Sequence, residues 1–102
     1  MQSVTFHPEA GREMRNAANY YDDSRGGLGD RFLDAIENGI HRIQANPFQW
    51  RKIRGEVRRC LMSRFPYGIL YIADEKQIFI LAIMHLHRKP DYWLNRLNDI
   101  PQ

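Results

Sequence analysis

The sequence has little that would stabilise it in an oxidising compartment or anchor it in a membrane. Its one cysteine, Cys60, excludes an internal disulfide. Its longest apolar run, Ile78 to Met84, is far shorter than the ~20 residues that span a bilayer. The segment from Met1 to His7 lacks the basic and apolar regions of a signal peptide. We therefore expect a cytoplasmic protein with no membrane partner.

Motifs that indicate common chemistries are also missing. The sequence has no G-x-S-x-G, no Walker or G-x-G-x-x-G loop, no H-E-x-x-H and no paired cysteines. This argues against serine hydrolases, nucleotide-binding enzymes and zinc sites. The glycine-rich stretch from Gly26 to Gly29 follows no predicted strand, so we interpret it as a turn between helices. We expect neither a cofactor nor a bound metal.

Charge is unevenly distributed along the 102 residues. Residues 1–50 carry five arginines against seven acidic side chains, whereas residues 51–102 carry ten basic against five acidic side chains. A basic half favours an anionic partner, either nucleic acid or an acidic protein segment. The alternative is a solvated basic strand edge that deters aggregation.

Periodicity predicts two helices after a short first strand, 2–6. Pro8 fits the first turn of a helix, and apolar residues then recur at helical spacing up to Tyr21. A second apolar stripe runs from Leu28 to Ala45 and stops at Pro47. The glycines between the two stripes indicate a helical hairpin with one face to bury.

The second half changes to the alternation of strands. We expect strands over 56–65, 67–73 and 78–87, the last apolar on both faces and therefore central, and a final short helix over 90–97. This gives one α+β domain, 1–102, of order β-α-α-β-β-β-α. Its curved antiparallel sheet is covered on one face by the helical hairpin, and its other face is partly open.

Two groups of residues are candidates for function. The first is basic, with aromatic neighbours Trp50 and Tyr67, and comprises Arg51, Lys52, Arg54, Arg58, Arg59 and Arg64. We expect it to line a groove that meets phosphate or carboxylate groups, with the aromatics either stacking on bases or packing at the core rim. The second is His85 and His87, which share one side of the last strand and serve either acid–base chemistry or core-edge packing.

The chain as a whole resembles the RelE/ParE family of bacterial toxins, closest to its ParE branch. The residues that carry this resemblance are Tyr20-Tyr21, Gly27-Leu28-Gly29, Phe32-Leu33, Ile43, Pro47, Trp50, Arg58-Arg59, Arg64-Phe65-Pro66-Tyr67, Ile69, Tyr71, Ile78 to Ile83, His85, Arg88, Pro90, Tyr92-Trp93 and Arg96. The resemblance implies the toxin of a type II toxin–antitoxin module, which arrests growth and stabilises plasmids. It further implies a cognate antitoxin partner with an acidic tail, and contact with operator DNA only through that antitoxin.

The resemblance leaves the target open. ParE-like members inhibit DNA gyrase by binding, without catalysis, whereas RelE-like members cleave mRNA on the ribosome with basic residues. A third possibility is a degenerate toxin that only binds its antitoxin. In the nuclease branch an arginine commonly occupies the position of Gly68, so the gyrase interpretation is favoured.

Candidate residues follow from these alternatives. For a nuclease they are Arg58, Arg59, His85, His87, Arg88 and Tyr92, with Glu56 as a further acid–base candidate. For antitoxin or target binding they are Arg51, Arg54, Arg58, Arg59, Arg64, Tyr67, His87 and Arg88. We also expect Trp93 to pack its ring against the sheet, near Pro66 or His85.

Overall fold

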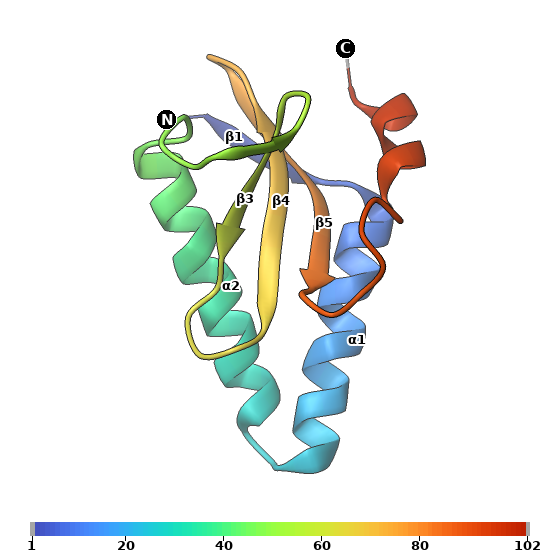
Figure 1. Cartoon of the computed structure of the whole chain (residues 1–102). Helices are drawn as coiled ribbons and strands as arrows, with labels where there is room; N and C mark the ends of the chain where they lie inside the picture. Colours follow the sequence, from blue (N-terminus) through green and yellow to red (C-terminus); the bar gives the residue numbers. More distant parts are fainter. Residues whose placement is uncertain (1, 102) are drawn as a thin grey trace.

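The computed structural model describes residues 2–101 and shows an α+β arrangement of two helices and a sheet (Figure 1). The elements are β1 (Ser3–Phe6), α1 (Pro8–Ser24), α2 (Leu28–Ala45), β2 (Lys52–Arg54), β3 (Val57–Leu61), β4 (Tyr67–Ala73), β5 (Gln77–His85) and the 3-10 helix η1 (Leu94–Asp99). The predicted fold class is confirmed, and the second helix has the predicted bounds. The differences from the prediction include an added strand, a shorter β3, a β5 that ends at His85 instead of residue 87, a mixed rather than antiparallel sheet, and the C-terminal helix.

The sheet has the strand order β1-β5-β4-β3-β2. The strand β1 runs parallel to β5, and the remaining neighbours are antiparallel. The extra strand, β2, is absent from the prediction because its three residues are all exposed and show no alternation. The middle strand is β4 rather than the apolar β5, although β5 is internal and buried on both faces.

Residues at the ends of the two helices determine the geometry of the helical hairpin. Pro8 occupies the first turn of α1, and the ring of His7 caps it because Nδ1 accepts a hydrogen bond from Glu9 N at 3.0 Å. Gly27 adopts the left-handed conformation, with φ 88°, just before α2. A Cβ on Gly29 would lie 2.5 Å from the carbonyl oxygen of Ala18, so this glycine lets the two helices approach closely.

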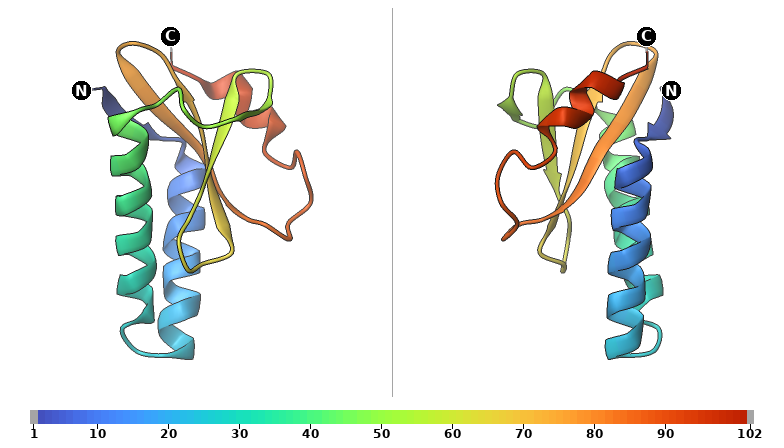
Figure 2. Two further views of the ribbon diagram at one scale, coloured as in Figure 1. Left: turned by 60° about the vertical axis from the view of Figure 1, so that its left-hand side comes forward. Right: turned by 90° about the vertical axis from the view of Figure 1, so that its right-hand side faces the viewer.

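The sheet is buried on both faces by two separate clusters of side chains. The helix face packs under α1 and α2, with Phe32, Ile36 and Ile43 against Ile69 and Ile80. The far face carries the second cluster, which comprises Val57, Leu70, Phe79, Leu81, Ala82, Met84 and Trp93, with Leu94, Leu97 and Ile100 at its margin. Figure 2 shows the C-terminal chain lying across the side of the sheet opposite the helices.

The far face is therefore less open than the sequence predicts. The C-terminal segment, residues 86–101, covers it with Trp93, which is 1% exposed. The final helix also differs from the predicted 90–97, because turns occupy residues 91–93 and η1 follows. Among residues 2–101, no helix combines the length and apolar character that crossing a bilayer requires.

Candidate functional site

The centre of polar contacts is Glu13, a residue of α1 that is not among the candidates chosen from the sequence. Its Oε1 and Oε2 accept hydrogen bonds from Arg96 Nη1 and Nη2, each at 2.9 Å. Tyr92 Oη donates to Oε2 at 2.6 Å, and Arg88 Nη1 lies 3.3 Å from the same oxygen. The sequence gives one sign that Glu13 has a special role: it is a charged residue on the side of α1 that otherwise carries the apolar residues Ala10, Met14 and Ala17.

Glu13 also completes the hydrogen bonding of the sheet edge. The strand β1 pairs with β5 only from Gln77 to Ile80, which leaves the following part of the β5 edge without a strand neighbour. Ile83 N donates to Glu13 Oε1 at 3.0 Å, and Arg96 Nη1 donates to Leu81 O at 3.1 Å. Two side chains thus take the place of a missing strand, and the C-terminal segment is tied to both α1 and β5.

These contacts bear on the residues considered for catalysis. The guanidinium of Arg88 stacks 3.8 Å from the centre of the Tyr92 ring. Burial, and then the hydrogen bond to Glu13 and its charge, raise the pKa of Tyr92 far above its usual range. Burial alone would lower the pKa of Arg96, but the hydrogen bond and charge of Glu13 raise it overall. The hydroxyl of Tyr92 donates to Glu13 and its ring is stacked by Arg88, so this side chain is engaged in contacts within the chain.

The rings of His85 and His87 lie close together, but not because they share one side of a strand as predicted: β5 ends at His85, and His87 belongs to the turn that follows. Their ring centres are 5.2 Å apart, and His85 packs edge-on against Tyr67 with centres 5.0 Å apart. His87 N donates to His85 Nδ1 at 3.1 Å, so this nitrogen acts as an acceptor. A cavity of about 250 Å³ adjoins His85 but not His87, and it is lined by Glu13, Asn16, Ala17, Tyr20, Tyr67, Ile83, His85 and Arg88. Residues 2–101 contain no group of three or more side chains that could hold a metal ion.

The predicted arginine groove is not formed, because the basic residues are dispersed. Arg58 and Arg59 are adjacent on β3 and therefore project from opposite faces of the sheet. Arg58 donates to the carbonyl oxygens of Phe48 at 3.1 Å and Trp50 at 2.6 Å, which anchors the loop before β2. Arg59 extends its aliphatic stem over Gly68, since a Cβ there would lie 3.0 Å from Arg59 Cγ and Cδ.

The other basic residues of the candidate set are also separated. Arg54 pairs with Asp91 of the C-terminal segment at 2.9 Å, and Lys52 pairs with Glu56 at 3.0 Å. Arg51 is exposed before β2, and Arg64 belongs to the loop between β3 and β4. The expectation of one arginine-lined trough is wrong because alternate strand residues face opposite ways and several guanidinium groups have partners within the chain.

The structure also shows the surroundings of the two aromatic candidates, Tyr67 and Trp50. Tyr67 packs against Tyr21, Phe32 and His85, and burial raises its pKa. Trp50 packs against the core under α2. Both aromatics therefore match the core-rim interpretation.

Glu56 and the histidines lie at opposite ends of the sheet. Glu56 comes just before β3, at the end where Arg58 pairs with Tyr71 of β4, whereas His85 pairs with Tyr67 at the other end of β4. Glu56 is thus not combined with the histidines.

Known proteins share both the sequence pattern and the fold of this chain. A family model described as "ParE toxin of type II toxin-antitoxin system, parDE" matches residues 4–90. The match ends before Tyr92, Trp93 and Arg96. A solved structure from P. aeruginosa, titled as the chromosomal ParDE TA system, superposes with a TM-score of 0.65 and 20% identity, covering 85% of this chain and 98% of that one. This likeness shows a shared fold. No curated protein sequence matches the chain.

Proposed function

We propose that this chain, which belongs to the ParE toxin family of type II toxin–antitoxin systems, inhibits DNA gyrase by binding and is neutralised by a cognate antitoxin. The family match over residues 4–90 is the observation that carries the proposal. The protein would act in the cytoplasm, and operator DNA would be contacted only through the antitoxin. Growth arrest and plasmid stabilisation are the expected consequences.

The state of the candidate catalytic groups supports binding over catalysis. Tyr92 donates to Glu13, Arg88 is paired with Glu13 and stacked on Tyr92, and Arg58 donates to two backbone carbonyls. Phosphodiester cleavage would need such groups free to face a substrate and to move protons. In this chain they stabilise the fold.

The proposed antitoxin contact is supported by charge. Residues 51–102 carry twice as many basic as acidic side chains. A disordered acidic tail that folds on such a surface gains steered association and charge-assisted hydrogen bonds. We propose that Arg51, Arg59, Arg64 and His87 remain available to such a partner, whereas Arg54, Arg58 and Arg88 contribute mainly through contacts within the chain.

A second candidate, cleavage of mRNA on the ribosome, rests on one specific observation. His85, Tyr67 and Arg88 line the 250 Å³ cavity beside α1, and the ring of His87 lies next to that of His85. Imidazole groups titrate near neutrality and serve as acids or bases. The reactive assembly would then be the two histidines, without Tyr92.

Induction of the protein alone in cells separates these functions. Gyrase inhibition predicts filamentation with DNA-damage signalling, whereas mRNA cleavage predicts rapid arrest of translation and cuts at codon positions. A His85→Ala/His87→Ala variant is the matched control, since it should keep the first phenotype and abolish the second. Growth without either phenotype would contradict both, and would leave a degenerate toxin that binds only its antitoxin.

A further inference from the structure

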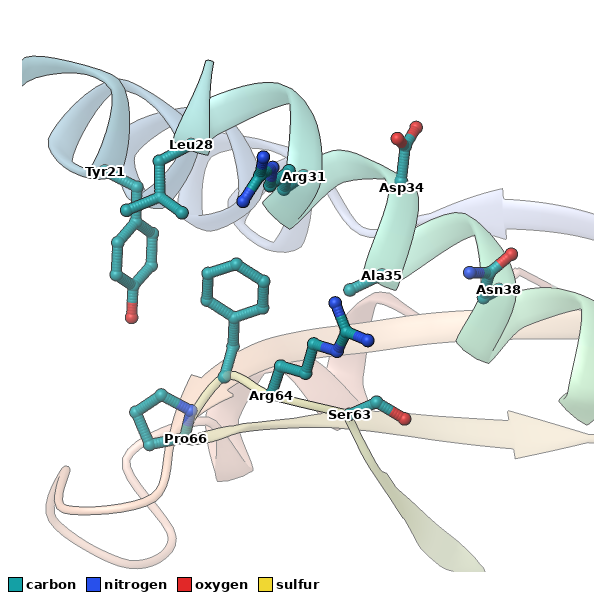
Figure 3. A pocket seen from close by; sticks show the side chains of 10 residues that line it. Tyr21, Leu28, Arg31, Asp34, Ala35, Asn38, Ser63, Arg64 and Pro66 are labelled. Atoms are coloured by element: carbon teal, nitrogen blue, oxygen red, sulfur yellow. The ribbon is translucent and has the colours of Figure 1, made fainter. Parts of the chain in front are cut away.

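The cavity of about 250 Å³ beside α1 has two well-defined walls. One is a single face of α1, because Glu13, Asn16, Ala17 and Tyr20 recur at spacings of three, one and three. The other is formed by the ends of β4 and β5 and by the turn after β5. This cavity shares no lining residue with the larger one, of about 790 Å³, between α2 and the β3–β4 loop (Figure 3). The two cavities therefore recognise ligands through different side chains.

Three aromatic rings line the smaller cavity, those of Tyr20, Tyr67 and His85. Tyr20 is 66% exposed, so much of its ring is free to contact a ligand. The rings of Tyr67 and His85 pack edge-on against each other, with centres 5.0 Å apart, which holds both in place. Ala17 and Ile83 are buried and add apolar surface. A flat aromatic ligand therefore gains stacking and apolar contact here.

Glu13 is the acidic residue of the lining, and its carboxylate is already satisfied. Both of its oxygens accept hydrogen bonds from Arg96, and Oε1 also accepts one from Ile83 N. Its Oε2 accepts a further bond from Tyr92 and lies 3.3 Å from Arg88 Nη1. Two guanidinium groups thus face one carboxylate. The local charge favours an anionic ligand over a cation.

The other polar side chains of the lining supply hydrogen-bond donors. His87 N donates to Nδ1 of His85, so the proton of the neutral His85 ring lies on Nε2, which is a donor. Arg88 is half exposed and contacts Glu13 through Nη1, which leaves further N–H groups of the guanidinium for a ligand. Asn16 is exposed on α1, and its carboxamide both donates and accepts. These groups match a ligand that carries acceptors and negative charge.

We infer that this cavity binds one purine nucleotide, with the base stacked on Tyr20 and the phosphate on Arg88. His85 Nε2 or the Asn16 carboxamide donates to N7 of the base, an acceptor that both purines carry. The exposed His87 adds a second polar group near the phosphate. Pockets for drug-sized molecules measure roughly 300–1,000 Å³, so 250 Å³ suits a single small ligand and not a folded peptide segment. Binding requires no chemistry on the ligand, so the site stands apart from both gyrase inhibition and mRNA cleavage.

Titration of the full chain with 5′-GMP, followed by two-dimensional NMR, tests the site. We expect saturable chemical-shift changes on residues 13–20 and 83–88. Tyr20→Ala removes the stacking ring, and Asn16→Ala removes the carboxamide. Both residues are exposed on α1, so the variants should fold. Tyr20→Ala should weaken binding at least about fivefold, because one base–aromatic stack accounts for at least that factor. Asn16→Ala should weaken it to a smaller extent.

Each variant has a matched control. Phe48→Ala removes another exposed aromatic ring, in the loop before β2, and Asn19→Ala removes a neighbouring exposed carboxamide of α1. Neither residue lines the cavity, so both controls should bind 5′-GMP as tightly as the wild type. Equal affinity of Tyr20→Ala and the wild type would overturn the assignment, as would shift changes confined to other parts of the chain.

Further ligands identify what is recognised and where it comes from. Inorganic phosphate that binds as tightly as 5′-GMP would show that no base is recognised and would overturn the inference, as would a lack of saturation at about 10 mM 5′-GMP. Short purine single strands of DNA and of RNA are titrated in parallel. Tighter binding of a strand assigns an unpaired base of that nucleic acid, and equal affinity assigns the free nucleotide. Gyrase assays test the proposed function separately, since neither result decides the other.

Discussion

Arg96 and Glu13 form a two-pronged ion pair across 83 residues of sequence, with both hydrogen bonds at 2.9 Å. Their side chains are only 10% and 12% exposed. The pair joins the C-terminal segment to α1, and through Ile83 N and Leu81 O it also closes the edge of β5. One carboxylate therefore connects three parts of the fold.

Removing this carboxylate should destabilise the protein strongly. In Glu13→Ala the Arg96 guanidinium stays buried without its partner, and breaking a buried pair in this way costs about 3–5 kcal/mol. Urea unfolding of the variant measures the loss. The control is Glu9→Ala, whose partner Arg12 lies 3.5 Å away on the surface, and which should change stability by less than about 1 kcal/mol. Equal effects of the two substitutions would show that the Glu13 contacts contribute little.

Trp93 should be a main stabilising side chain of the far face. It is almost fully buried against Leu70, Phe79 and Leu81, so Trp93→Ala should lower the free energy of unfolding by about 3–5 kcal/mol. Trp50→Ala is the comparison, because Trp50 is only partly buried and should cost less. Unaltered stability of Trp93→Ala would mean that the C-terminal segment does not cover the sheet. The sequence predicts that Trp93 packs on the sheet, and it does. It lies, however, on the face of the sheet opposite to the one where His85 contacts Tyr67.

Gly29 provides a test of helix packing. Because a Cβ at this position would lie 2.5 Å from Ala18 O, Gly29→Ala should push α1 and α2 apart and cost about 1–3 kcal/mol. Gly26→Ala is the matched control, since a Cβ at that position would meet no atom within 4 Å and its effect should be near zero. Thermal unfolding of both variants would decide, and similar melting temperatures would contradict the close approach of the helices.

Tyr71 should give stability a distinct dependence on alkaline pH. Its hydroxyl donates to Pro47 O at 2.6 Å, and burial raises its pKa to about 12 from 10.0. The folded state then holds this proton more tightly than the unfolded state. Its contribution is complete below pH 10 and is lost as pH rises from 10 towards 12. Tyr71→Phe should lose about 1 kcal/mol at pH 7 and show a smaller decline above pH 10, as measured by urea unfolding across that range. An identical alkaline decline in both proteins would exclude Tyr71 as its source.

The helices and most strands could be predicted because their signals are local. The apolar stripe from Leu28 to Ala45 sets α2, and Asp74 closes the β4–β5 turn by accepting hydrogen bonds from Lys76 N and Gln77 N. The strand β2 could not be predicted, because its exposed residues carry no alternating pattern and it exists only through pairing with β3.

The candidate site was harder to predict because its contacts are distant in sequence. Nothing near Glu13 indicates that Tyr92 and Arg96 will reach it, although a carboxylate on an apolar helix stripe is a usable signal. The arginines are conspicuous because many lie close together in the sequence, but this clustering does not show which way each side chain points. Arg58 turns to backbone carbonyls, whereas Arg31, a residue of the less basic half, lines an open cavity of about 790 Å³ together with Arg64.

Gyrase supercoiling in vitro tests the central proposal most directly. Purified wild-type protein is added to gyrase, relaxed plasmid and ATP, with and without an equimolar amount of the protein from the neighbouring reading frame. Inhibition by binding predicts loss of supercoiling with the chain alone, equal loss with the His85→Ala/His87→Ala variant, and restored supercoiling when the partner is added. Unimpaired supercoiling, together with cuts in ribosome-bound mRNA that vanish in the histidine variant, would contradict it.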